Sequence, residues 1–311
     1  MKAVILEAPG AAPVVRDDLP GPEPAANEVL VRVRASSINP IDNAIAAGML
    51  KDMFEHVFPV TLGRDYAGVA ERVGTEVTGF AAGDEVFGFL PGFSPAVHDG
   101  AWAELITVPE NVSIARKPAG VDLAAAGSAP LAAVTAMTAI DALALSPGET
   151  LLVVGASGGV GGFAVQLAAA AGATVLAPGL PEDDAYLRDL GVSEVLPREG
   201  DVVAAVRERH PDGVDALLDA VSYTPGTYDA ALKPGARVAS PTNAAGEGPG
   251  RTNVMSMPTT ENLQRLGQLL EAGTLKVHIR HTYALDEAPA ALQALATSHT
   301  QGKLALRVSA G

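Results

Sequence analysis

Three regularly spaced glycines could bind an anion. Gly155, Gly158 and Gly161 follow a run of branched apolar residues at 151–154, and an alanine- and leucine-rich segment begins near Val160. This pattern predicts a strand buried on both faces, a turn, and an amphipathic helix. Backbone N–H groups at the start of such a helix attract anions, and glycine lets a diphosphate approach closely. The predicted cofactor-binding turn comprises Gly155, Ala156, Ser157, Gly158, Gly159, Val160 and Gly161.

The turn alone leaves two interpretations open. Its spacing, GxxGxxG, departs from the GxGxxG fingerprint of dinucleotide-binding turns. Glycines also occur in buried turns only because they pack closely. Either the turn binds a dinucleotide or it is a structural turn, and the rest of the chain favours the first reading.

Composition excludes several classes of function. The 311 residues carry 21 Lys+Arg and 36 Asp+Glu, a net charge of −15, which repels nucleic acid and anionic membranes. No basic cluster offsets this charge. No apolar run is long enough to span a bilayer, and the opening MKAVILEAPG does not resemble a signal peptide. We expect a cytoplasmic protein that acts on a small molecule.

Cysteine and histidine, the usual ligands of transition metals, are absent or few. The chain has no cysteine, which excludes disulfides, thiolate zinc sites, iron–sulfur clusters and a cysteine nucleophile. Its six histidines are scattered, without an HxH or HExxH pair. We therefore expect no metal.

The first 122 residues predict a closed or nearly closed β-barrel, because short strands alternate with glycine-rich turns and no long helix intervenes. The expected strands are residues 2–7, 28–35, 68–73, 84–89, 103–108 and 112–115. A long loop at 88–100 is either a lid or a surface excursion.

From residue 123 the pattern changes to alternating helices and strands, beginning with a helix at 123–144 that breaks at Pro130. Such alternation predicts an α/β fold with a doubly wound parallel sheet, whose ligands lie at the carboxyl ends of its strands. A helix at 260–272 follows. The tail, with strands at 276–280 and 303–308 around a helix at 286–296, is expected to return to the first domain. The predicted domains are 1–122 plus 274–311, and 123–273.

Six motifs in order carry a family resemblance: residues 29–48, 62–74, 79–89, 100–108, 155–168 and 302–308. Together the chain resembles the medium-chain dehydrogenase/reductase superfamily, and within it the zinc-free quinone oxidoreductase branch that includes zeta-crystallin. The resemblance implies a Rossmann domain inserted into a GroES-like barrel, a cleft between them, and a homodimer. It implies NADPH as cofactor, with NADH as the alternative.

The zinc ligands of related enzymes are replaced. The resemblance places them at Ile38-Asn39-Pro40 and Gly63-Arg64-Asp65, where no cysteine or histidine stands. Without a metal or a nucleophile, the remaining chemistry is hydride transfer, in which the protein orients the nicotinamide and stabilises an oxyanion.

Three residues become catalytic candidates through the resemblance. Asn39 matches an asparagine near the nicotinamide; its amide either donates to the acceptor oxygen or holds the turn before Pro40. Arg64 either supplies positive charge or pairs with Asp65. Thr135 either lies beside the nicotinamide or bonds its own helix. The neighbouring Asp42 either orients a side chain or caps a helix.

NADPH is favoured because Ala177-Pro178-Gly179 offers no carboxylate to the adenosine ribose. The family's NADPH-binding lysine and tyrosine positions correspond to Asp183 and Arg198. Arg198 either binds the 2′-phosphate or lies on an exposed loop. Gly179, Arg198 and Asn243 complete the predicted cofactor set.

The acceptor is expected to be a quinone or an α,β-unsaturated carbonyl compound. Residues 46–50, AAGML, lack the tyrosine with which enoyl thioester reductases of the family donate a proton, so the proton comes from water. A second hypothesis is an NADPH-binding redox sensor or structural protein without turnover, consistent with this loss and with Ser222-Tyr223 in place of two glycines. Alcohol dehydrogenation is disfavoured because nothing replaces zinc.

Overall fold

The computed structural model describes residues 1–91 and 97–309 and divides the chain into two compact units. The first unit contains residues 1–131, 257–272 and 277–311, and the second contains 132–256 and 273–276. The predicted loop at 88–100 includes residues 92–96, which lie outside the described residues. Among the described residues, no helix is long and apolar enough to cross a membrane.

The first unit is built around one long strand, β3 (Glu28–Ile38). One edge of β3 pairs with β5, while its other edge pairs with β7 along residues 28–32 and with β16 along 35–38. The resulting seven-stranded sheet comprises β15 (Ile279–Ala284), β16 (Lys303–Arg307), β3, β5 (Asp65–Val73), β6 (Glu85–Phe89), β7 (Leu105–Pro109) and β8 (Ala115–Arg116). A smaller sheet contains β1 (Ala3–Leu6), β2 (Val14–Arg16) and β4 (Val60–Thr61). Both sheets contribute to one apolar core.

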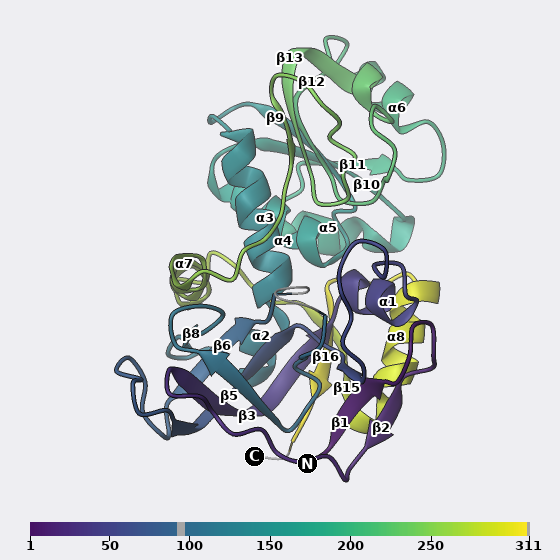
Figure 1. The fold of residues 1–311 in the computed structure, drawn as a ribbon. Coiled ribbons are helices and arrows are strands. Elements are labelled where there is room, and N and C mark those ends of the chain that lie inside the picture. The colour runs from purple at the N-terminus through teal and green to yellow at the C-terminus, as the bar shows by residue number, and fades with distance from the viewer. Residues whose placement is uncertain (92–96, 310–311) are drawn as a thin grey trace. The chain divides into compact units, whose positions relative to one another are not determined.

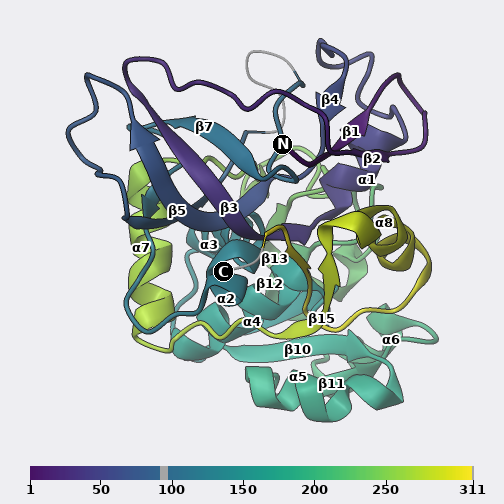
Figure 2. The ribbon, with the colours of Figure 1, turned by 90° about the horizontal axis from the view of Figure 1, so that it is seen from below.

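The chain tail returns to the first unit, as predicted. β16 pairs antiparallel with β3, with Leu304 opposite Ile38, and β15 pairs with β16. Helix α8 (Ala288–Thr297) lies beside α1 (Pro40–Ala46), where Asn43 Nδ2 donates to the Leu292 carbonyl at 3.1 Å (Figure 2). The unit also includes α2 (Leu123–Ser128) and α7 (Thr260–Glu271).

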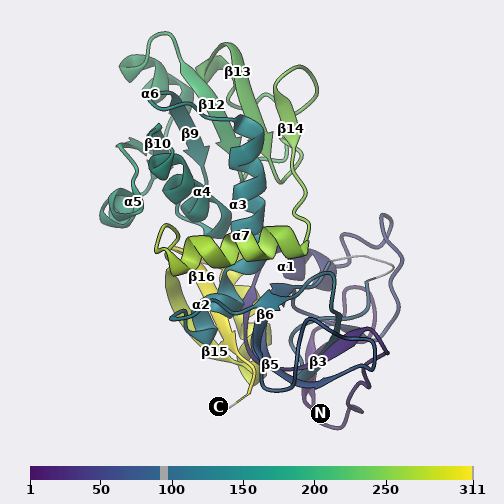
Figure 3. The same ribbon diagram turned by 90° about the vertical axis from the view of Figure 1, so that its left-hand side faces the viewer.

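The second unit contains the predicted parallel sheet, with strand order β11-β10-β9-β12-β13-β14 and every neighbouring pair parallel. The short strand β14 forms one edge (Figure 3). The strands are β9 (Thr150–Val154), β10 (Thr174–Gly179), β11 (Glu194–Pro197), β12 (Val214–Asp219), β13 (Leu232–Ser240) and β14 (Arg251–Asn253). Five of them, β9 to β13, contribute apolar residues to a second core.

Helices lie on both faces of this sheet. Crossover connections, which are right-handed in nearly all parallel sheets, carry the chain from β9 to β10 and β11 through α4 (Gly159–Ala170) and α5 (Asp184–Leu190). The path then reverses through α6 (Val202–Arg209) to β12, so α6 covers the opposite face (Figure 1). Helix α3 (Pro130–Leu143) precedes β9 and follows α2, with the predicted break near Pro130.

The division of the chain differs from the predicted one at both borders. Helices α2 and α7 group with the first unit rather than with the second. Gly267 of α7 faces the Phe87 ring of β6, a contact that joins this helix to the first unit. The strand predicted at 276–280 is found at 279–284, because the Lys276 backbone instead hydrogen-bonds the Gln166 side chain of α4.

Candidate functional site

The glycine turn connects β9 to α4, as its sequence predicts. Gly155 has φ +89°, a left-handed conformation that favours glycine, and a Cβ there would lie 2.6 Å from Val221 Cγ2. A Cβ on Gly161 would lie 2.2 Å from the Gly155 carbonyl oxygen. The turn can therefore be this tight only with glycine at both positions.

Gly158 differs from these two because a side chain there would not clash with the rest of the turn. A Cβ there would meet only the Gly155 oxygen, at 3.4 Å. Gly158 is the N-cap residue of α4, and Gly159 and Val160 begin the helix. First-turn N–H groups have no partner within a helix, so they can donate to a diphosphate that approaches over Gly158. Ala156 and Ser157, which precede Gly158, are buried. The observed cradle fits the diphosphate of a dinucleotide.

The other predicted cofactor residues follow strands of the same parallel sheet. Gly179 ends β10, and the N–H of Arg198, directly after β11, donates to the Gly179 carbonyl at 3.1 Å. Asn243 follows β13 and has φ +64°. Because the carboxyl ends of parallel strands share an edge, Gly179, Arg198 and Asn243 lie on the edge that carries the glycine turn.

Val221 belongs to this edge and was not identified from the sequence. It follows β12, touches the Gly155 position and is 51% exposed. Asp219 fixes the segment, because its Oδ1 accepts the Val221 and Ser222 N–H groups at 3.1 and 2.9 Å. Tyr223 next to it is 76% exposed. The sequence could have indicated Val221 by its position directly after a strand of the parallel sheet, where ligands bind.

Asn39 lies in a buried polar network of the first unit. Its Nδ2 donates to Asp65 Oδ2 at 2.8 Å and to Ser37 Oγ at 3.3 Å, and its Oδ1 accepts from Lys303 Nζ at 2.6 Å. Lys303 Nζ is also 3.7 Å from Asp65 Oδ2. Burial lowers the pKa of Lys303. Sequence reasoning did not assign Lys303 to the site, because its partners are remote in the chain.

Asp42 caps helix α1. Its Oδ2 accepts the Asn39 backbone N–H at 2.7 Å, which is the helix-capping alternative of the sequence analysis. Its Oδ1 is buried without a hydrogen-bond partner among the described residues. Burial raises the pKa of Asp42 to about 7, although the charge of Arg64 opposes this shift.

Arg64 is almost completely buried. Its Nη1 and Nη2 atoms donate to the Pro91 and Thr61 carbonyls, each at 3.2 Å, and its Nε has no partner among residues 1–91 and 97–309. Burial lowers its pKa. Thr135, the third catalytic candidate, is 7% exposed and lies on α3.

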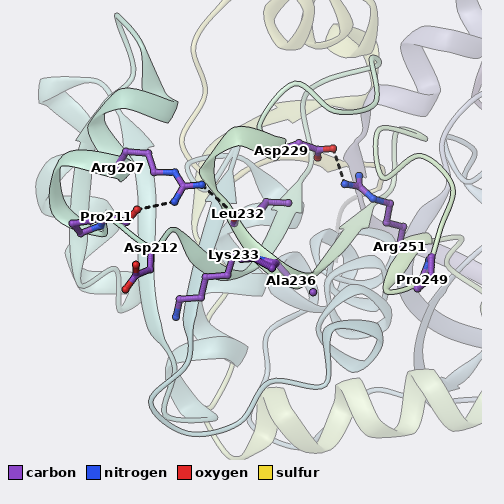
Figure 4. A pocket seen from close by; sticks show the side chains of 11 residues that line it. Arg207, Pro211, Asp212, Asp229, Leu232, Lys233, Ala236, Pro249 and Arg251 are labelled. Carbon is purple, nitrogen blue, oxygen red and sulfur yellow. Dashed lines mark hydrogen bonds and ion pairs between the residues drawn. The ribbon is translucent and has the colours of Figure 1, made fainter.

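A hollow of about 650 Å³ lies elsewhere in the second unit (Figure 4). Asp212 precedes β12 and Leu232 begins β13, so this hollow lies at the amino ends of those strands, opposite the glycine turn. Its cations already have partners: Arg207 donates to the Pro211 and Leu232 carbonyls, and Arg251 pairs with Asp229 at 2.7 Å. These arginines therefore stabilise the fold around the hollow, and they are not needed there to bind a ligand.

Comparison with known proteins gives the family. Residues 25–119 match the family described as alcohol dehydrogenase GroES-like domain, and residues 190–306 match that described as zinc-binding dehydrogenase. The chain has no cysteine, and its described residues contain no group of three or more histidines or carboxylates that could hold a metal.

Individual relatives extend over almost the whole chain. The chloroplast envelope quinone oxidoreductase homolog of Arabidopsis thaliana is 30% identical, covering 95% of this chain and 94% of that protein. The mitochondrial NAD(P)H oxidoreductase RTN4IP1 of Bos taurus is also 30% identical, covering 91% and 82%. The solved quinone oxidoreductase from Coxiella burnetii superposes with a TM-score of 0.87 at 28% identity, covering 99% of both chains. The chain therefore belongs to the medium-chain dehydrogenase/reductase family, in its quinone oxidoreductase branch.

Proposed function

We propose that this protein is a metal-free, NADPH-dependent reductase that delivers hydride to a quinone or to the β-carbon of an α,β-unsaturated carbonyl compound. The glycine turn carries this proposal, because Gly158 is the N-cap of α4 at the ligand-binding edge of a parallel sheet, and a side chain at this position would meet only the Gly155 oxygen, at 3.4 Å. The names of the relatives, quinone oxidoreductase and NAD(P)H oxidoreductase, support the same reaction class.

The residues of the chain bind and orient the reactants. In the proposal, N–H groups of α4 hold the diphosphate, and Gly155 and Gly161 keep the turn in place. Reduced nicotinamide, when bound, supplies the hydride. Asn39, Arg64 and Thr135 remain the proposed groups for positioning the acceptor, and the reduced acceptor takes its proton from water because residues 46–50 include no tyrosine.

Oxidation of NADPH by a panel of simple quinones and small enals tests the proposal. We expect acceptor-dependent oxidation that persists after the protein is treated with a metal chelator. Binding of NADPH without oxidation by any member of the panel would contradict the proposed activity.

A second candidate function is an NADPH-binding protein without turnover. One observation favours it: the Asn39 amide group donates to Asp65 and Ser37 within the protein, rather than towards a free oxygen. Tight NADPH binding combined with no oxidation across the acceptor panel is the result that this alternative predicts.

Arg198 is proposed to select NADPH. The Arg198 backbone N–H donates to the Gly179 carbonyl, which places Arg198 beside the end of β10, and Asp183 next to this end is buried and accepts the Leu180 N–H at 3.1 Å. A guanidinium there can bind a 2′-phosphate with charge-assisted hydrogen bonds. We therefore expect Arg198→Ala to raise KM for NADPH about tenfold, equivalent to roughly 1.4 kcal/mol, and to leave KM for NADH unchanged.

Arg188→Ala is the matched control. It removes the same charge from the exposed face of α5, where Arg188 pairs with Asp184 at 2.9 Å. Steady-state kinetics with both coenzymes give the ratio of Michaelis constants for each variant. If the ratio of the NADPH and NADH Michaelis constants in Arg198→Ala equals that of the wild type, Arg198 does not bind the 2′-phosphate.

We also propose a cytoplasmic homodimer, as the sequence and its resemblance imply. Light scattering of the purified protein measures the mass directly, and a mass of one chain at working concentration would exclude the dimer.

A further inference from the structure

The first unit contains a buried ammonium group, that of Lys303. Lys303, the first residue of β16, is only 4% exposed. Lysine is rarely buried to this extent, because removing its charge from water is costly unless partners compensate. Here the partners are Asn39 Oδ1 at 2.6 Å and Asp65 Oδ2 at 3.7 Å.

Lys303 determines how the Asn39 amide is oriented. An ammonium group only donates hydrogen bonds, so the Asn39 oxygen must face Lys303. The Asn39 nitrogen then faces Asp65 and Ser37, at 2.8 and 3.3 Å. The reverse orientation would place the NH₂ group against the ammonium and the oxygen against a carboxylate. The charge of Lys303 therefore specifies one amide orientation.

Asp65 extends the network to the connecting helix. Its Oδ1 accepts the Leu131 N–H at 2.6 Å. Leu131 is the second residue of α3, after Pro130, and an N–H in the first turn has no partner within the helix. A carboxylate at this end also interacts favourably with the helix dipole. Asp65 thus fixes the first turn of α3, and Thr135 lies one turn further along the same helix.

We propose that Lys303 is a positioning residue for the reduction: it orients Asn39 directly and, through Asp65, fixes the turn of α3 that precedes Thr135. This inference rests on the proposed function, because Asn39 and Thr135 are the groups proposed to meet the reactants. It explains why the chain keeps a buried ion pair, since apolar side chains of similar size often stabilise a fold at least equally well.

Lys303→Met tests the proposal, because methionine approximates the length of lysine and removes its charge. We expect kcat for NADPH oxidation with a quinone to fall ten- to a hundredfold, as small displacements of positioning groups do. The dissociation constant for NADPH, which depends on the glycine turn, is expected to stay within about twofold. The emission of Trp102, the single tryptophan, should also change, because its Nε1 donates to the Ser37 carbonyl at 3.1 Å.

Two further variants separate positioning from stability. Lys303→Met leaves Asp65 without its cation, and the double variant Lys303→Met/Asp65→Asn removes that unpaired charge. We expect the double variant to regain the wild-type melting temperature while kcat stays low. Lys233→Met, which breaks the ion pair with Asp215 in the second unit, is the control and should retain kcat.

Two results would overturn the proposal for Lys303. One is a kcat of Lys303→Met within about twofold of wild type below its melting temperature. The other is a double variant that regains kcat together with stability. A wild-type protein that fails to oxidise NADPH with every acceptor of the panel would instead overturn the proposed function, while the Trp102 emission still reports whether Lys303 organises the network.

Discussion

Asp42→Asn is expected to stabilise the first unit against unfolding above about pH 7, by on the order of 4 kcal/mol. Burial raises the folded-state pKa of Asp42 from 3.8 to about 7, so the folded protein holds a proton that the unfolded chain releases between these values. The wild type therefore loses stability as pH rises from 3.8 to about 7. Asparagine has no such proton and avoids this loss, while its oxygen can still accept the Asn39 N–H.

Denaturant titrations at a series of pH values measure this effect. Trp102 is the single tryptophan and belongs to the first unit, so its fluorescence follows the unit that contains Asp42. Asp84→Asn is the matched control in the same unit. A hydrogen bond from Arg116 lowers the pKa of Asp84. Asp84→Asn should therefore destabilise the first unit at neutral pH and have little effect on its stability well below pH 3.8. Parallel pH curves for Asp42→Asn and wild type would contradict the account of Asp42.

Gly161→Ala is expected to weaken NADPH binding on the order of a hundredfold, or roughly 2.7 kcal/mol. Its Cβ, which is fixed to the backbone, would lie 2.2 Å from the Gly155 carbonyl oxygen, and neither atom can rotate away, so the turn and α4 must move apart. That movement displaces the N–H groups proposed to hold the diphosphate. Calorimetric titration with NADPH measures the loss, and a melting curve measures the accompanying loss of stability.

Gly158→Ala distinguishes a distorted turn from a blocked approach. Its Cβ would meet only the Gly155 oxygen, at 3.4 Å, so we expect the fold to keep its melting temperature while NADPH binds more weakly. Gly267→Ala in α7, where the nearest atom is 3.7 Å away, is the control and should bind NADPH normally. If Gly158→Ala binds NADPH as tightly as wild type, the diphosphate does not approach over this residue.

The second unit could be predicted closely because its signals are local. The apolar run of β9, the glycines after it and the amphipathic α4 lie within one short stretch, and alternation of strands and helices implies a parallel sheet. The short elements β2, β4 and β14 were not predicted, because two or three residues show no periodicity. Edge strand β15 carries exposed polar residues such as His281, so its alternation did not define its bounds.

The buried network of the first unit could not be predicted from local patterns. Asn39 and Lys303 are separated by 264 positions, and Asp65 and Leu131 by 66. Only the antiparallel pairing of β16 with β3 brings the first pair together. The sequence identified Asn39 and Arg64 through family resemblance, but their partners follow from tertiary structure.

The most direct test of the central claim is to use NADPH that carries deuterium at both C4 positions and to follow the label into the product of enone reduction, with protein treated with a metal chelator. Hydride transfer predicts one deuterium on the β-carbon of each product molecule, which mass spectrometry and NMR can locate. A product that carries no label at that carbon, or a reaction that stops when metal is removed, would contradict metal-free hydride transfer by this protein.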